Sequence, residues 1–316
     1  MSDQSFSCTA GDFELVLARQ GSGGIDLHRL VDRRARFDLA TPGTLFTFTL
    51  KRGAKHSGIP EEERVLDSSA GWKNVAIQAD PNGGLSLAWS QPLRGPEGLR
   101  VEAQVQPDPE TNALRWQLHI SSPGDGWALW RIVFPQVVFQ KPGEHPALLL
   151  PGLSGQLVHD AWDTDYHHRA NYSAGWVAPV PFTAIYGERT GLYWGIHDPL
   201  GSTREMIFDG DPQAHTLRLA FDHPIPGMGL AQTEYRLPGE VTWQLFRGDW
   251  FDATLIYKNW AGRHARWFPQ VTGEGRGDTP LWLRELSVWV SGEVKTQDGR
   301  ITAESLAPLK KLQEFF

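Results

Sequence analysis

The chain has 316 residues, of which 40% are hydrophobic and 21% charged, so it can bury a sizeable core, and extended disorder and a coiled coil are excluded. Its net charge of −7, without a run of basic residues, argues against a nucleic acid partner. The single cysteine, Cys8, excludes an internal disulfide, and no apolar leader or membrane-spanning stretch is present, so we expect a cytoplasmic protein without a membrane partner.

Short apolar runs that alternate with polar residues fill the chain from Phe13 to about Trp250. Residues 44–50 alternate with a period of two, and residues 85–89 follow the turn sequence at 80–84. Such runs, broken by Gly, Pro, Asn and Asp, are typical of antiparallel strands with one buried face.

Three hairpins are predicted from paired runs around turn sequences. In the second of them, Gly191 is expected to take a left-handed turn position. The paired segments are 99–106 with 113–120, 182–186 with 192–197, and 203–208 with 216–221. So many sequential strands exceed an immunoglobulin-sized sandwich of ~100 residues. We therefore predict a mainly β fold, a large two-sheet antiparallel sandwich over residues 1–248.

The pattern changes at Asp249, which is a good N-cap with an acidic residue three positions later. Ala253, Ile256, Tyr257 and Trp260 then recur at helical spacing. A glycine-rich stretch follows and reaches Pro280. Residues 249–280 are therefore predicted to be a linker helix and loop.

The last segment, residues 281–316, predicts the first βα unit of a second domain. Residues 281–290 favour a strand, and residues 302–316 place leucines on one helical face. A single parallel βα unit cannot bury both of its faces, so we expect a larger domain to continue beyond it. The alternative is that this strand and helix pack back on the sandwich.

Several motifs resemble a bacterial group of glycoside hydrolases. The sandwich motifs are YSAGW at 172–176, FTAIY at 182–186 and GLYWGIHDP at 191–199, and the connection motifs are FRGDWFDA at 246–253, IYKNWA at 256–261 and PLW at 280–282. The group is similar in layout to endo-α-N-acetylgalactosaminidases and α-galactosidases. The resemblance implies a galactose-mutarotase-like supersandwich that precedes a catalytic (β/α)8 barrel, with a carbohydrate partner.

The resemblance also implies that the catalytic pair lies elsewhere. In such enzymes two carboxylates on later barrel strands act as nucleophile and acid/base. No residue of this sequence matches that pair, and Glu285 in the first predicted barrel strand is interpreted as structural or as part of a pocket wall. We therefore expect the isolated chain to be inactive, supporting the barrel and forming one wall of its substrate pocket. No cofactor is expected, because no nucleotide-binding or nucleophile-elbow motif occurs.

The densest polar segment, residues 159–169, is predicted to be a loop with three interpretations. It could contact sugar, be purely structural, or bind a metal, for which Asp163 and Asp165 suit Ca²⁺ and the histidines suit a transition metal. The EF-hand pattern fails, and no metal residue is assigned. The candidate sugar-binding residues are Trp162, Asp163, Asp165, His167, His168, Arg169 and, near the end of the predicted barrel strand, Trp289.

Two other functions stay open. The chain could be a stand-alone carbohydrate-binding module. It could also be a mutarotase-like epimerase, which needs a histidine and a carboxylate around one sugar. His159, His167, His168 or His197 could pair with Glu205 or Asp198. For Asp198, a turn in which its carboxylate accepts backbone N–H bonds is favoured over a place in a cleft.

Overall fold

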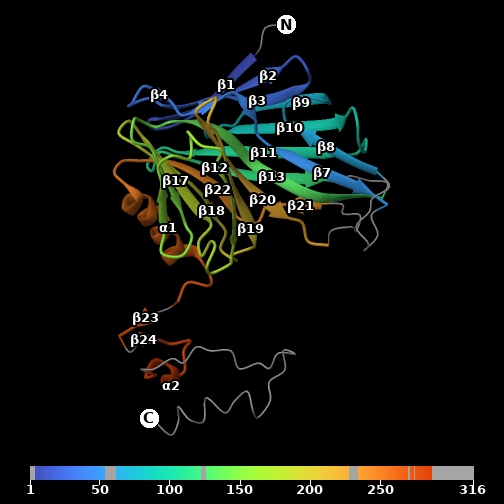
Figure 1. Cartoon of the computed structure of the whole chain (residues 1–316). Coiled ribbons are helices and arrows are strands. Elements are labelled where there is room, and N and C mark those ends of the chain that lie inside the picture. Colours follow the sequence, from blue (N-terminus) through green and yellow to red (C-terminus); the bar gives the residue numbers. More distant parts are fainter. Residues whose placement is uncertain are drawn as a thin grey trace. The chain divides into compact units, whose positions relative to one another are not determined.

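The structure, a computed structural model, describes residues 4–53, 62–121, 126–227, 234–269, 271–273 and 275–286. The chain divides into two units, residues 1–267 and 268–316. The first unit is mainly β and contains three antiparallel sheets, here called A, B and C (Figure 1).

Sheet A contains the first strands of the chain. In it β1, β2, β3 and β4 are neighbours in that order, and β6 also pairs with β3. Its strands are β1 (Gln4–Ala10), β2 (Phe13–Gln20), β3 (Gly24–Asp32), β4 (Phe37–Asp38) and β6 (Gly43–Thr44).

Sheet B has the order β16-β19-β20-β13-β7-β8, with β5 also paired to β13. Its strands are β5 (Ala40–Thr41), β7 (Thr47–Arg52), β8 (Glu62–Asp67), β13 (Trp127–Gln140), β16 (His167–Tyr172), β19 (Arg204–Asp211) and β20 (Thr216–Pro224). The long strand β13 lies in the middle of the sheet, between β20 and β7.

Sheet C has the order β15-β14-β17-β18-β22-β12-β11-β10-β9, with β21 paired to β12. Its strands are β9 (Trp72–Ala79), β10 (Leu85–Pro92), β11 (Arg100–Asp108), β12 (Ala113–Ser121), β14 (Ala147–Leu150), β15 (Gln156–Val158), β17 (Phe182–Tyr186), β18 (Gly191–His197), β21 (Glu234–Arg236) and β22 (Glu240–Phe246).

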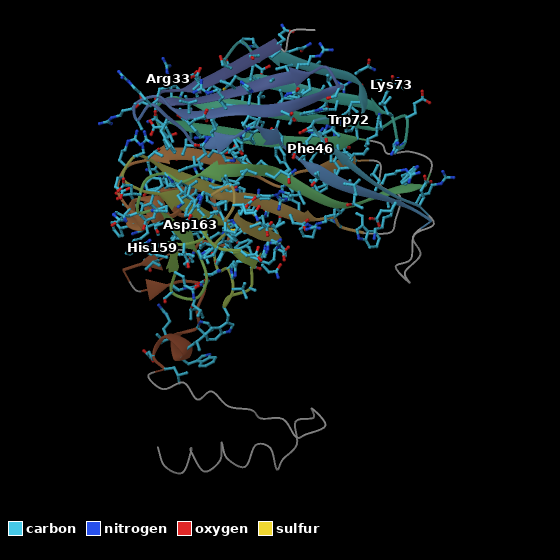
Figure 2. All side chains as sticks on the ribbon, turned by 45° about the horizontal axis from the view of Figure 1, so that its top comes forward. Arg33, Phe46, Trp72, Lys73, His159 and Asp163 are labelled. Atoms are coloured by element: carbon cyan, nitrogen blue, oxygen red, sulfur yellow. The ribbon has the colours of Figure 1, made fainter. Side chains whose placement is uncertain are left out.

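Aromatic side chains pack sheets B and C face to face. Trp116 of β12 meets Phe134 of β13 edge to face at 6.1 Å between ring centroids, and Trp194 of β18 meets Phe139 of β13 in the same way at 5.3 Å. In another part of the core, Phe46 and Trp72 lie edge to face at 6.5 Å (Figure 2). The expected mainly β, sandwich-type fold is confirmed, but the described residues of this unit form three sheets and not the two predicted, because the first strands make the separate sheet A. The galactose-mutarotase-like layout stays a prediction.

The predicted hairpins are present as β11–β12, β17–β18 and β19–β20, each antiparallel. The expectation for Gly191 was wrong, since it is not among the residues with positive φ. Glycine is required at position 191 for a steric reason instead, because an added Cβ would lie 2.8 Å from the Phe246 ring of β22.

Helix α1 (Trp250–His264) begins where the sequence predicts. The Asp249 side chain accepts a hydrogen bond from the Phe251 N–H, and the Asp252 side chain accepts one from the Asp249 N–H, which completes a capping box. The helix buries Ala253, Tyr257 and Ala261, and it packs beside β17 and β18 (Figure 1). Among the described residues, no helix has the length and apolar character needed to cross a bilayer.

The second unit contains β23 (Val271–Thr272), β24 (Gly275–Arg276) and α2 (Leu281–Arg284) within its described part. The strand predicted over residues 281–290 was wrong at its start. Pro280 stands at the N-cap of a helical turn, and its carbonyl accepts the N–H groups of Leu283 and Arg284. Glu285 is the C-cap of α2. The remainder of the predicted strand and the predicted helix over 302–316 lie outside the described residues.

Candidate functional site

The polar segment singled out in the sequence divides between a loop and a strand. Only residues up to Tyr166 form the loop, whereas His167, His168 and Arg169 begin β16, which pairs with β19. The prediction of one continuous loop was wrong. In β16 the side chains of Ala170 and Tyr172 point into the core and are buried, while those between and before them are more exposed, which is the alternation of a strand.

Asp163 of this loop is held by two side-chain partners, Lys141 and His215. Its Oδ2 accepts from Lys141 Nζ at 2.5 Å, and its Oδ1 lies 2.7 Å from His215 Nδ1. These hydrogen bonds keep the pKa of Asp163 below its usual value. His159 lies on the same flank (Figure 2), with its Nδ1 3.0 Å from the Pro146 carbonyl oxygen.

A second ionic cluster surrounds Asp209 of β19. Its Oδ1 lies 2.9 Å from His167 Nδ1 and 2.8 Å from Arg169 Nη1, and its Oδ2 accepts from Arg218 at 2.8 Å. Asp165 reaches the other ring nitrogen of His167 at 3.1 Å. Burial raises the pKa of Asp209, but the hydrogen bonds from Arg169 and His167 outweigh it and the pKa is lowered. The cluster ties β16, β19 and β20 together.

The aromatic members of the segment lie deeper. Trp162 has no exposed surface and packs in the main core, so its expected stacking on a sugar is corrected. The loop that precedes β16 packs directly against the backbone of β19. A Cβ added at Gly210 would lie 2.1 Å from the Ala161 carbonyl oxygen. His168 lies between the Tyr166 and Phe208 rings at 6.3 and 5.9 Å.

Asp163, Asp165, His167 and Arg169 therefore already have hydrogen-bond or ionic partners within the protein. Sugar contact by Asp163, Asp165, His167, His168 and Arg169 stays a prediction. Within the described ranges, no three His, Cys, Asp or Glu side chains form a group that could hold a metal ion. Trp289 lies outside the described residues.

A hollow lies on the outward face of sheet C, between α1 and strands β12, β18 and β22. We call it the α1 groove. Its volume of about 760 Å³ falls in the range of small-molecule sites. The strands contribute Arg115, Gln117, His197, Glu240, Thr242 and Gln244, and the helix contributes Asp252, Asn259, Trp260, Arg263 and His264.

His197 and Trp260 form a fixed aromatic wall of the α1 groove. The Nε2 of His197 lies 3.1 Å from the Tyr193 hydroxyl, and its Nδ1 lies 3.0 Å from the Thr242 hydroxyl. The Trp260 ring stacks on the imidazole at 4.6 Å with an interplanar angle of 13°. Burial lowers the pKa of His197 to about 3, so the imidazole is neutral near pH 7.

Glu240 is a partly buried carboxylate of the α1 groove. Its Oε1 lies 3.7 Å from Arg115 Nε. Burial raises the pKa of Glu240, and the charges of Arg115 and His264 oppose that rise without cancelling it. The site therefore offers one carboxyl group that takes up a proton more readily than an exposed glutamate does.

Sequence reasoning named His197 but missed the groove as a whole. The residues of the groove come from β12, β18, β22 and α1. These elements are distant in the chain, and they meet because β22 lies between β18 and β12 in sheet C. One sequence signal could have indicated the groove: polar residues at alternate positions of two strands, which place them on the same outward face. They are Arg115 and Gln117 of β12 and Glu240, Thr242 and Gln244 of β22.

A comparison with family models finds the description "Domain of unknown function (DUF6259)" over residues 235–315. That range covers β22, α1 and the described part of the second unit. A search of the curated proteins found no match.

Solved structures with a similar fold were found at low sequence identity. A quadruple mutant of an α-N-acetylgalactosaminidase from Bifidobacterium bifidum matches 83% of this chain with a TM-score of 0.58 and 12% identity. An α-galactosidase from Lactobacillus brevis matches 83% with a TM-score of 0.54 and 8% identity, and a GH36 α-galactosidase from Geobacillus stearothermophilus matches 80% with a TM-score of 0.52 and 13% identity.

The chain spans only part of these structures, 39% of the first and 42% of each of the other two. The match falls on their N-terminal sandwich region. The described sandwich thus has the fold of the N-terminal region of GH36 α-galactosidases and of an α-N-acetylgalactosaminidase.

Proposed function

We propose that this chain is the sandwich region of a glycoside hydrolase that acts on α-linked galactose-type or related sugars, and that this region is not itself catalytic. The observation that carries the proposal is the fold similarity, which covers 83% of this chain but only 39% of the α-N-acetylgalactosaminidase chain. In this proposal a (β/α)8 barrel follows the sandwich and carries the catalytic carboxylates.

Exposed apolar side chains support a domain that packs on this chain. In the second unit Leu281 and Trp282 are 59% and 68% exposed. In the first unit Trp176 is 82% exposed, and its carbonyl accepts a hydrogen bond from the N–H of Leu153, which is 55% exposed. In this proposal these two pairs of exposed apolar side chains belong to the surface that the further domain covers.

The proposed role of the sandwich is to support the barrel and to form one wall of its substrate pocket, in the cytoplasm. The test compares the 316-residue chain with the product of the reading frame extended past Phe316, each assayed on aryl α-galactoside and aryl α-N-acetylgalactosaminide. We expect hydrolysis by the longer protein alone. Hydrolysis by the 316-residue chain far above the buffer rate would contradict the non-catalytic role, and an inactive longer protein would contradict the hydrolase assignment.

A sugar epimerase is the second candidate function, and one observation favours it. Glu240, whose pKa burial raises, shares the α1 groove with His264, so a carboxyl group and an imidazole line the same cavity. Polarimetry on freshly dissolved galactose tests this candidate. Mutarotation faster than in buffer, and lost in Glu240→Gln, would favour the epimerase over the non-catalytic role.

A further inference from the structure

We propose that the α1 groove is a binding site for a neutral saccharide on the sandwich itself. The site would act in the 316-residue chain alone. The inference therefore goes beyond the proposed hydrolase and does not depend on a barrel.

The first support is a rigid aromatic wall. Trp260 lines the groove and is only partly buried, while one face of its ring is covered by His197 at 4.6 Å. His197 is in turn fixed through both ring nitrogens by Tyr193 and Thr242. An indole ring whose position is set in this way offers a flat apolar surface against which the C–H face of a pyranose ring can stack.

The second support is a set of unused amide groups. Gln117, Gln244 and Asn259 line the groove, and none of their side chains has a hydrogen-bond partner among the residues that the structure describes. Each amide offers a carbonyl acceptor and two N–H donors in one plane. Neighbouring sugar hydroxyls, which both donate and accept, match that chemistry.

The third support is the charge of the groove. Two guanidinium groups, of Arg115 and Arg263, line the groove together with two carboxyl groups, of Asp252 and Glu240, and the imidazole of His264 is the remaining titratable group on the helix side. The guanidinium and carboxyl groups are equal in number, so the groove has no strong excess of either charge to attract a phosphate or a cation. A neutral ligand rich in hydroxyl groups is therefore the class that fits.

The groove also continues along the sheet. A second hollow of about 640 Å³ shares Gln117 and Gly239 with it and extends over β9, β10 and β11. Arg100, Glu102 and Gln104 line that extension. A chain of several sugar units therefore has room beyond the unit that would lie on Trp260.

Calorimetric titration of the 316-residue chain with galactose, N-acetylgalactosamine and raffinose tests the inference. We expect saturable binding of at least one of them, and weaker binding of glucuronate, because the groove has no excess positive charge. No saturable binding of any of the three neutral sugars would overturn the proposal. Tighter binding of glucuronate would overturn the choice of a neutral ligand.

Matched variants locate the site. Trp260→Ala should weaken binding at least about tenfold, whereas Trp250→Ala, on the same helix and outside the groove, should leave it unchanged. Because Trp260 also packs on His197, the exposed Asn259→Ala is the second variant, with its neighbour Lys258→Ala as control. Asn259→Ala should weaken binding by about threefold to tenfold, the loss of one or two neutral hydrogen bonds.

The loop predicted from the sequence supplies the competing outcome. If Asp165→Ala abolished binding while Trp260→Ala and Asn259→Ala did not weaken it, the site would lie on β16 and its loop, and the groove proposal would be wrong. A chain that binds sugar but never gains hydrolytic activity when extended would retain this inference and lose the proposed function.

Discussion

Arg247 donates two parallel hydrogen bonds to Asp32, which lies 215 positions earlier in the chain. Its Nη1 is 2.6 Å from Asp32 Oδ2, and its Nη2 is 3.0 Å from Asp32 Oδ1. Asp32 ends β3 and is fully buried, and it also accepts from the Thr190 hydroxyl at 2.7 Å. This pair joins the N-terminal sheet to the point where the last strand of sheet C leads into α1.

We predict that Arg247→Ala lowers the free energy of unfolding by about 2–4 kcal/mol, since it leaves a buried carboxylate without its main partner. Urea unfolding followed by tryptophan fluorescence measures the change. Arg236→Ala, whose side chain is 71% exposed, is the control and should cost less than about 0.5 kcal/mol. An equal effect of the two variants would show that the Asp32 pair adds nothing to stability.

The buried pair of Asp198 and Arg204 should respond more strongly. Their side chains are 3% and 1% exposed, and Arg204 Nη2 lies 2.6 Å from Asp198 Oδ2. The Asp198 carboxylate also accepts the N–H groups of Leu200 and Ser202, which confirms the turn predicted from the sequence.

Arg204→Met is expected to lower the free energy of unfolding by about 3–5 kcal/mol, because the Asp198 charge stays buried and uncompensated. Adding Asp198→Asn should recover part of that loss. The control is Arg29→Met, which breaks an ion pair of similar length, 2.7 Å, whose arginine side chain is 51% exposed, and it should cost about 1 kcal/mol or less. Failure of the double variant to recover stability would contradict the electrostatic explanation.

Two buried histidines predict a loss of stability in mild acid. Burial lowers the pKa of His197 and of His223 to about 3 each, and the His223 Nε2–H donates to the Phe134 carbonyl at 2.6 Å. An unfolded histidine takes up a proton near pH 6.5, so below that pH the unfolded chain binds more protons than the folded one.

The free energy of unfolding should therefore fall as the pH drops from about 6.5 towards 3, by about 1.4 kcal/mol per pH unit for each histidine. Urea unfolding at a series of pH values measures this slope. His223→Gln should remove about half of the part that the two histidines contribute. NMR titration of His197 and His223 with midpoints near 6.5 would refute the prediction.

Gly210 of β19 should be required for docking of the loop that precedes β16. A Cβ there would lie 2.1 Å from the Ala161 carbonyl oxygen, and the Gly210 N–H donates to the Tyr166 carbonyl at 2.7 Å. Gly210→Ala is expected to destabilise the fold by about 1–3 kcal/mol through overpacking. Gly175→Ala, which meets no atom within 4 Å, is the matched control for differential scanning calorimetry. Equal melting temperatures for the two variants would contradict close loop packing.

Local features of the fold could be predicted from the sequence because their signals lie within a few residues. The capping box at Asp249 and Asp252 fixed the start of α1, and turn residues between alternating runs located the hairpin of β17 and β18. The short helix at Leu281 was missed because a run of apolar residues suits a strand and a helix alike.

Sheet order and the site could not be predicted in the same way. Strand β22 lies between β18 and β12, and this order brings Glu240 beside Arg115, in a groove that Asn259 of α1 also lines. No local pattern specifies such pairing between distant segments. For the same reason Trp162, in a polar stretch of sequence, could not be recognised as a core residue.

The direct passage from β22 into α1 has a mechanical consequence. Only Arg247, Gly248 and Asp249 separate the two elements, and β22 is held by β18 on one side and by β12 on the other. Tension applied at the end of α1 would thus reach an interior strand and would have to shear two ladders of hydrogen bonds together, whereas an edge strand could be peeled away one bond at a time. Whatever follows Trp267 in the chain is thus anchored, through α1, to an interior strand of sheet C and not to an edge strand.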